Sequence, residues 1–268
     1  MSDLHEIYAI KYGQHQRKAS ENFIGGDPHE TSDPLAYYVW AVVGPGGPFI
    51  VDTGFDEEVG RRRNRPIGPP VAEGLKAIGI APDGVKNVII THLHYDHSGN
   101  TALFPNARYH LQDCEMEYAT GRCMCHAMQK APFECDYIVE MVRKNYAGRV
   151  QFHDGTSELA PGLTVHKIGG HSKGLQCVRV KTKRGYVVLA SDTAHLYAHI
   201  DQARVFPITY NVADVLEGYQ TLKKLASSRA HIVPGHDPKV LQEYPAAKNG
   251  LESWIVRLDA EPKALIAS

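Results

Sequence analysis

The stretch THLHYDHSGN, residues 91–100, is the feature that most limits how this chain can fold. It directly follows the apolar run VII, which predicts a buried strand. Side chains alternate along extended backbone, so His92 and His94 are expected to point the same way. Asp96 and His97 follow where the chain turns. Because residues just beyond a strand end lie at the sheet rim, where ligands and metals are commonly held, these four side chains are expected to share one small volume.

Three later residues stand at the ends of apolar runs in the same way. They are His171 after a Gly-Gly turn, Asp192 after GYVVLAS and His236 after HIVPG. A lone histidine at a strand end is usually a surface residue, and a purely structural zinc is more often held by cysteines. Imidazole suits zinc and related ions, and a carboxylate can bridge two of them. Seven such residues at matching strand ends therefore predict a catalytic site for two divalent ions, with zinc favoured.

The rest of the chain alternates between short β-type runs and helical segments. Runs rich in Val, Ile or Tyr predict strands at AYYVWAVVG, GPFIVDTG, KNVIITH, LTVHKIGG, QCVRVKT, GYVVLASD and AHIVPGH. Helices are expected at 57–63, 70–78, 112–119, 136–145 and 212–227. This order predicts an α/β fold with layered sheets and a single domain over residues 1–268. The segment 109–152 is more helical and irregular, and is interpreted as an insertion or cap.

Charge and cysteine content limit the expected partners and compartment. The formal net charge of −1 predicts no bulk attraction to nucleic acid or to an anionic membrane. No long apolar stretch follows the N-terminus, so neither a signal peptide nor a membrane span is predicted. The five cysteines have no disulfide-type spacing, which favours a reducing, cytoplasmic setting. Cys123, Cys125 and His126 lack a standard zinc spacing, so free thiols are favoured there over a third metal.

The H-x-H-x-D-H pattern in residues 91–100, with the three later strand-end residues, resembles the signature of the metallo-β-lactamase superfamily. The run FIVDTG is similar to an upstream strand of that superfamily. The resemblance covers about residues 36–237 and implies an αββα sandwich with metals at the sheet edge. It implies one ion held by His92, His94 and His171, and another held by Asp96, His97 and His236, with Asp192 bridging them. Asp52, in FIVDTG, is expected either to orient a ligand or to cap the turn.

Within the superfamily, the chain looks most like the N-acyl homoserine lactonase, or quorum-quenching lactonase, group. This likeness implies that a hydroxide bridging the two ions opens an acyl-homoserine lactone or another small lactone, and that Asp96 or Asp192 moves a proton to the leaving oxygen. Those lactonases have a tyrosine three residues after the bridging aspartate, where this chain has His195. His195 is therefore the catalytic candidate for a hydrogen bond to the developing oxyanion. A thioester hydrolase of the glyoxalase II kind and a phosphodiesterase remain open as alternatives.

Substrate contacts are expected outside the metal ligands, with structural packing as the alternative for each residue. The candidates are Phe23, Ile24, Phe133, Tyr137 and Tyr197. The basic run RRRNR at 61–65 is interpreted as a solvated face, and guidance of an anionic substrate is the alternative. The expected partner is a small lactone or ester, and a homodimer remains open.

Overall fold

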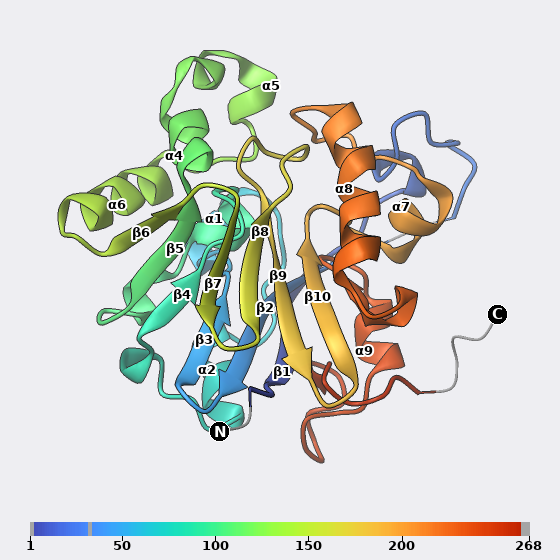
Figure 1. The fold of residues 1–268 in the computed structure, drawn as a ribbon. Coiled ribbons are helices and arrows are strands. Elements are labelled where there is room, and N and C mark those ends of the chain that lie inside the picture. The colour runs from blue at the N-terminus through green and yellow to red at the C-terminus, as the bar shows by residue number, and fades with distance from the viewer. Residues whose placement is uncertain (1–2, 32–33, 264–268) are drawn as a thin grey trace.

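The computed structural model describes residues 3–31 and 34–263, so residues 1–2, 32–33 and 264–268 of the expected domain lie outside the described residues. Two β-sheets pack face to face, and helices cover the outer face of each (Figure 1). The predicted α/β sandwich is confirmed.

The first sheet has the strand order β12-β1-β2-β3-β4-β5-β6 within the described residues. Its strands are β1 (Glu6–His15), β2 (Leu35–Gly44), β3 (Gly47–Val51), β4 (Asn87–Ile89), β5 (Arg108–Gln112), β6 (Val150–His153) and β12 (Ile255–Arg257). The four strands from β3 to β6 run parallel, whereas the other pairs are antiparallel. The carboxyl ends of β3 and β4 therefore lie at the same edge of the sheet.

The second sheet has the order β11-β10-β9-β8-β7. Its strands are β7 (Thr156–Ala160), β8 (Leu163–Lys167), β9 (Gln176–Thr182), β10 (Gly185–Ser191) and β11 (Ile232–Pro234). Strands β10 and β11 pair in parallel, so their carboxyl ends also share an edge. The other pairs in this sheet are antiparallel.

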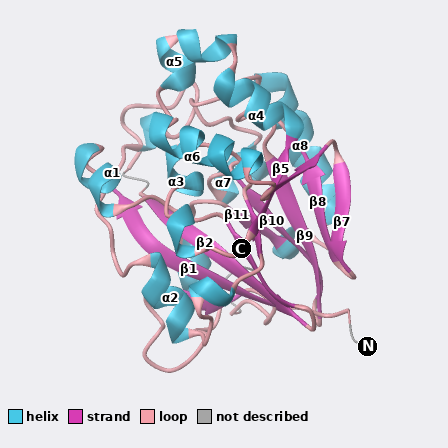
Figure 2. Ribbon diagram, turned by 90° about the vertical axis from the view of Figure 1, so that its left-hand side faces the viewer, coloured by secondary structure: helices cyan, strands magenta, loops and turns pink. Residues whose placement is uncertain are grey.

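Helices cover both outer faces and supply several connections. The α-helices are α1 (Glu57–Arg62), α2 (Val71–Ala77), α3 (Tyr95–Ser98), α4 (Asp113–Thr120), α5 (Ala127–Lys130), α6 (Cys135–Tyr146), α7 (Tyr197–Gln202), α8 (Val212–Leu225) and α9 (Lys239–Glu243). Short 3-10 turns occur at Ala19–Glu21, Pro82–Gly84, Thr101–Leu103, Arg122–Cys125 and Arg229–His231. Helices α1, α2, α3 and α6 lie in front of the first sheet in Figure 2. In the described parts of the chain, no helix has both the length and the apolar character needed to cross a bilayer.

Strand β2 shows why the sheets stack in this way. Alternate residues along it face opposite sides. Tyr38 and Trp40 pack into the core between the sheets, together with Val178 and Leu189 of the second sheet. Their neighbour Val39 faces the helices that cover the first sheet. Because both faces of β2 are buried, its sequence is almost continuously apolar.

The five expected helices are present, each within about two residues of the expected bounds. The segment 109–152, interpreted as an insertion, begins and ends in strands β5 and β6 of the first sheet. The helical part between those strands is the portion that lies outside the sheet. The five cysteines are free thiols, as the spacing predicted.

Candidate metal centre

The seven strand-end residues meet at one edge of the sandwich. The ligand atoms of His92, His94 and His171 lie within 4.8 Å of one another, and so do those of Asp96, His97 and His236. A third such group contains His92, His97 and Asp192. All seven side chains are buried, with at most 8% of any residue exposed. The sequence therefore located this cluster, although its residues span 145 positions of the chain from 92 to 236.

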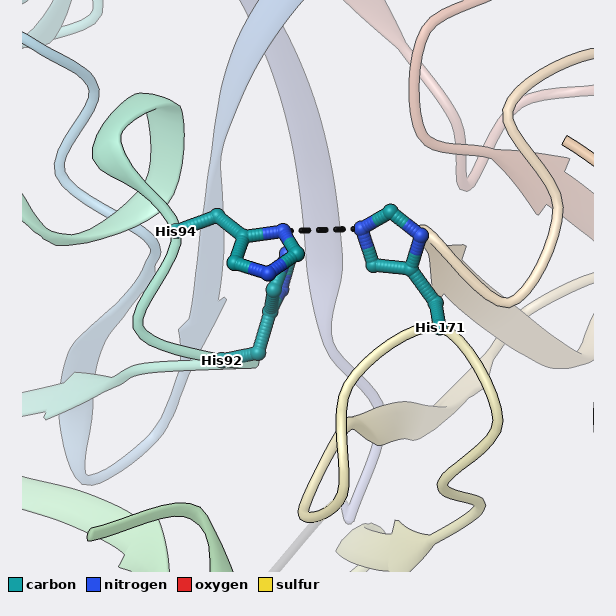
Figure 3. A group of neighbouring side chains, drawn as sticks. All are labelled: His92, His94 and His171. Atoms are coloured by element: carbon teal, nitrogen blue, oxygen red, sulfur yellow. Dashed lines mark hydrogen bonds between the residues drawn. The ribbon is translucent and has the colours of Figure 1, made fainter. Parts of the chain in front are cut away.

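Figure 3 shows how the first three rings converge from two separate segments. His92 and His94 leave the end of β4, whereas His171 lies in the loop between β8 and β9. Nδ1 of His94 and Nε2 of His171 are only 2.9 Å apart. Two ring nitrogens can approach this closely only with a proton or a cation between them.

Asp192 lies at the centre of the cluster and faces both sets of rings. Its Oδ2 is 3.2 Å from Nε2 of His171 and 3.0 Å from Nε2 of His195. Its Oδ1 is 2.9 Å from Nε2 of His236 and 3.2 Å from Nε2 of His97. The two carboxylate oxygens thus serve different partners, which is the arrangement a bridging ligand requires.

The far nitrogens of two rings are fixed by hydrogen bonds to the chain. Nδ1 of His97 donates to Oδ2 of Asp52 at 2.7 Å, and Nδ1 of His236 donates to the carbonyl of Ala36 at 2.8 Å. Oδ1 of Asp52 accepts from the backbone N–H of Thr91 at 2.7 Å. These bonds fix the ring orientation and direct Nε2 of each ring into the cluster. The orienting role is thus the interpretation of Asp52 that the contacts favour.

Two non-glycine residues at the strand exits have backbone that is normally unfavourable. Asp52 has φ of 62° and Ser191 has φ of 46°, both in the left-handed region. Thr91 joins them, because its hydroxyl lies 2.8 Å from both Asp52 Oδ2 and Ser191 Oγ. The two sheets are therefore linked directly beside Asp192, and the local backbone strain is held in place by this contact.

The donor set fits divalent cations. Nε2 of His92, Nε2 of His97 and Nδ1 of His171 are buried with no hydrogen-bond partner among the described residues. A buried polar atom without a partner costs about 1–3 kcal/mol, so such atoms point to a missing ligand. At His92 and His97, these atoms face Asp192 within the cluster that brings nitrogens and carboxylates together. This composition suits zinc and its neighbours among the transition metals.

The electrostatics of the cluster agree with that fit. Burial lowers the pKa of His92 well below 6.5, and the neighbouring His97 and His94 add to the effect, so the ring is in the neutral form that binds metals. Burial also disfavours charge on His97, but the carboxylates of Asp192 and Asp96 raise its pKa well above 6.5. Positive charge is therefore stable between these carboxylates, where a cation can replace a proton.

A cavity of about 190 Å³ opens beside the cluster. One wall is formed by ligand-type residues, His94, Asp96, His171, Asp192 and His236, together with His195. The cavity is also lined by Arg17, Leu35, Tyr37, Arg63, Arg65, Tyr95, Ala131, Pro132, Phe206 and Ile208. A small molecule in this cavity would therefore lie near both the ligand cluster and arginine and tyrosine side chains.

Comparison with known proteins agrees with this geometry. A family model of the metallo-beta-lactamase superfamily matches residues 32–236. The chain belongs to the metallo-β-lactamase superfamily. The N-acyl homoserine lactonase AttM of Azorhizobium caulinodans is 30% identical over 182 residues, which cover 65% of this chain and 66% of that protein. The N-acyl homoserine lactonase of Bacillus cereus is 27% identical over 208 residues, covering 71% of this chain and 77% of the relative. The match to AttM thus spans slightly less than two thirds of its length.

Solved structures of the same superfamily fold lie close to this one. A quorum-quenching N-acyl homoserine lactone hydrolase superposes with a TM-score of 0.74 at 23% identity, covering 90% of this chain and 95% of that one. AidC, a dizinc quorum-quenching lactonase, superposes with a TM-score of 0.67 at 15% identity, covering 89% and 90%. At these identities, the structural likeness supports the fold assignment alone.

His195 stands where the resemblance to superfamily lactonases places a tyrosine. Its ring stacks on Phe206, with centroids 3.6 Å apart and planes 13° from parallel, so its position is fixed. Burial lowers its pKa well below 6.5 despite the opposing attraction of Asp192, and the ring is therefore neutral. His195 lines the cavity beside Asp192, whereas Tyr197 is buried in the core between the sheets.

The five expected substrate contacts do not line this cavity in the described part of the chain. Phe23 packs with Phe206, which does line the cavity, and Phe133 packs edge-on against His94 with centroids 4.6 Å apart. Ile24 is 53% exposed, and Tyr137 donates to the carboxylate of Asp56 at 2.5 Å. Phe23 and Phe133 therefore support the wall from behind, which is the packing alternative that the sequence left open.

Glu115, at the start of α4, is a positioning residue that sequence reasoning did not find. Its buried carboxylate accepts from the N–H of Leu93 at 2.9 Å, from the hydroxyl of Ser172 at 2.8 Å and from the N–H of Gly174 at 2.8 Å. It thereby joins the loop that contains His92 and His94 to the loop that contains His171. A single glutamate in a helix gives no sequence signal for such a link.

Proposed function

We propose that this protein is a metal-dependent hydrolase that opens a small lactone, and that it uses two divalent ions, most favourably zinc. The observation that carries the proposal is the placement of Asp192 between two sets of buried imidazoles beside a cavity. The names of its relatives, N-acyl homoserine lactonases, support a lactone as the substrate.

The ligand sets follow from the clusters. His92, His94 and His171 would hold one ion, Asp96, His97 and His236 would hold the other, and Asp192 would contact both. When bound, such ions supply Lewis acidity, which polarises an ester carbonyl and acidifies water. The chain itself holds the ring nitrogens in place through Asp52 and the carbonyl of Ala36.

The cavity wall supplies the remaining groups for ring opening. Hydrolysis adds water to the acyl carbon, breaks the bond to the ring oxygen and leaves a hydroxy acid once that oxygen takes a proton. The carboxylate of Asp96 lines the cavity and is placed to move this proton. Nε2 of His195 lies in the same wall, 3.0 Å from Oδ2 of Asp192. With that carboxylate engaged by the ions, the N–H of the neutral imidazole would be free to donate to the carbonyl oxygen as negative charge develops.

The size of the cavity favours a compact substrate. Its volume of about 190 Å³ is below the range of about 300–1,000 Å³ that is usual for drug-sized ligands. A lactone without a long acyl chain fits this volume better than a long-chain acyl-homoserine lactone does.

A substrate panel tests the proposed function. The metal-loaded protein would be assayed by acid release with short- and long-chain acyl-homoserine lactones, simple aromatic lactones, a thioester and a phosphodiester. We expect lactone opening. Small lactones should be turned over at least about tenfold faster than the thioester or the phosphodiester, which corresponds to about 1.4 kcal/mol in transition-state free energy. Preferential turnover of either alternative substrate would contradict the proposal.

His195→Phe is expected to lower kcat for a lactone by about 10²-fold, as loss of one oxyanion donor does in other hydrolases. Phenylalanine can keep the stacking on Phe206 but has no N–H. His195→Gln, which keeps a donor, should retain more activity. Metal content, measured by plasma emission, should stay unchanged in both variants. Loss of one ion in His195→Phe would instead identify His195 as a ligand.

A further inference from the structure

Three arginines line the cavity together with the ligand cluster. They are Arg17, Arg63 and Arg65, and the last two belong to the basic run that the sequence analysis interpreted as a solvated face. That interpretation holds for Arg61 and Arg62, which are exposed. It does not hold for Arg63 and Arg65, which are half-buried and line the cavity.

Arg63 has a structural role within the cavity lining. Its Nε donates to Oε1 of Glu134 at 2.5 Å, and its NH2 donates to the carbonyls of Ala131 and Phe133 at 3.1 and 3.0 Å. Its guanidinium also lies 4.2 Å from the ring centroid of Tyr95. These contacts hold the guanidinium of Arg63 in place, and its ion-pair partner Glu134 also pairs with Arg62 at 2.9 Å.

Arg65 differs from Arg63 because its charge is not matched. Its NH1 donates to the carbonyl of Arg63 at 3.0 Å, and within residues 3–31 and 34–263 it forms no ion pair. Its Nε is buried and has no hydrogen-bond partner there. Burial disfavours its charge, but the neighbouring hydroxyls of Tyr95 and Tyr37 raise its pKa, so it remains a cation. These two hydroxyls are 3.1 Å apart.

Arg17 lies on the side of the cavity nearest His195. Its guanidinium is 5.1 Å from the ring centroid of Phe206, which stacks on His195. Its NH2 donates to the backbone carbonyl of Glu21 at 2.6 Å, whereas the carboxylate of Glu21 accepts from the N–H of Lys18. The contact with Phe206 and the hydrogen bond to the Glu21 carbonyl hold Arg17 against the cavity.

The pKa of the nearby His15 responds to the charges around it. Its burial lowers its pKa to about 4, and the positive charges of Arg65 and Arg17 contribute to the shift, with Glu21 opposing them. The positive charges of Arg65 and Arg17 therefore act on a neighbouring titratable group on this side of the cavity. Two arginine side chains on this part of the lining favour a nearby anionic group.

We propose that Arg17 and Arg65 form an anion subsite, so that the substrate is a small lactone or ester with a carboxylate outside the bond that is broken. The inference rests on the proposed function and specifies its substrate class. A planar guanidinium matches a carboxylate with two parallel hydrogen bonds, and partial burial strengthens the pairing. Tyr37 connects the ligand cluster to the proposed anion subsite. Its ring packs edge-on against His236 with centroids 5.5 Å apart. Its hydroxyl lies beside Tyr95 and Arg65.

The test compares two substrates that differ only in charge, a phthalide with a ring carboxylate and its neutral carboxamide. The wild-type protein should prefer the carboxylate by at least about tenfold in kcat/KM. Arg65→Gln and Arg17→Gln should each lower kcat/KM for the carboxylate by about 10–100-fold, which is the range for a hydrogen bond to a charged group. Turnover of the carboxamide should change by less than about threefold in both variants, since it makes no charged contact.

Arg61→Gln is the matched control, because Arg61 belongs to the same basic run but is exposed and does not line this cavity. It should leave both substrates unaffected. Arg65→Lys keeps the charge and should recover part of the preference. Metal content and melting temperature would identify any variant that has lost its fold. Equal turnover of the two wild-type substrates, or equal loss of both in Arg65→Gln, would overturn the subsite.

A binding experiment separates the subsite from the hydrolysis. The ring-opened products of the two phthalides would be titrated into the metal-loaded protein by calorimetry. The additional carboxylate should tighten binding by about tenfold or more in wild type, and Arg65→Gln should remove that gain. If neither lactone is opened but the binding preference is present, the proposed function fails and the subsite stands. If both are opened and no preference is seen, the subsite fails and the function stands.

Discussion

Asp192→Asn is expected to lower kcat/KM for lactone opening by about 10³-fold and to reduce bound metal from about two ions per chain to one or fewer. Asparagine has nearly the same volume but lacks the negative charge. In the native chain, Asp192 faces four imidazoles within 3.2 Å. Burial opposes the charge of Asp192, but attraction to His236 and His97 outweighs it and holds the pKa of Asp192 well below 3.8. The substitution therefore removes a charge that both ligand sets depend on.

Metal analysis and steady-state kinetics on the same preparation measure this effect. Asp154→Asn is a suitable control, because that side chain is largely exposed and its contact is a 3.7 Å ion pair with Lys167. The control should keep full metal and full activity. An Asp192→Asn protein with two bound ions and wild-type kcat/KM would rule out the bridging role.

Removal of both ions by a chelator is expected to abolish lactone opening and to lower the melting temperature by about 15–30 °C. An ion present at about 1,000 times its Kd stabilises the folded state by about 4 kcal/mol per site. In a chain of this length each kcal/mol corresponds to about 2–4 °C. The buried, unpartnered Nε2 atoms of His92 and His97 explain why the stripped protein should be less stable.

Calorimetric scans before and after chelation, followed by addition of zinc, manganese or iron, measure both effects. Activity and melting temperature should return together as about two equivalents of metal are bound. The increase in melting temperature on metal addition should be smaller in Asp192→Asn than in the wild-type protein. A stripped protein that contains less than about a tenth of an ion per chain and still works at its normal rate would contradict the whole proposed mechanism.

The metal cluster could be located from the sequence because strand exits are easily recognised. A short apolar run, a turn and a ligand-type residue recur, and the topology brings these ends to one edge. Helix α8 was equally clear, since Val215, Tyr219 and Leu222 follow the helical period and are buried.

Strand β1 was missed for a physical reason. Its pairing with β2 shifts register between Lys11 and Gly13, so the alternation of apolar and polar residues breaks in the middle of the strand. Strands β5 and β6 were included in an expected insertion because they are short and separated by helices. Their pairing partners lie far away in the chain, and short-range patterns carry no information about them.

The cavity lining could not be predicted in the same way. Arg17 and Arg65 come from separate segments that meet only through tertiary packing. The aromatic residues expected to contact substrate are apolar enough to pack inside the protein, and Phe23 and Tyr197 do so. Sequence pattern distinguishes a core aromatic residue from a ligand contact poorly, because both are apolar and periodic.

The ligand cluster and the arginines that line the cavity have different structural origins. Six of the seven ligand-type residues lie just beyond strands β4, β10 and β11, and His171 lies in the loop from β8 to β9, whereas Arg17 and Arg65 lie in connections outside both sheets. Mutations in those connections can accumulate during evolution without disturbing the reactive centre. A lineage with this architecture can therefore diversify in the compounds it degrades while inheriting one unchanged reaction chemistry. For protein engineering, saturation of Arg17 and Arg65, with the structural Arg63 left unchanged, would explore new specificities.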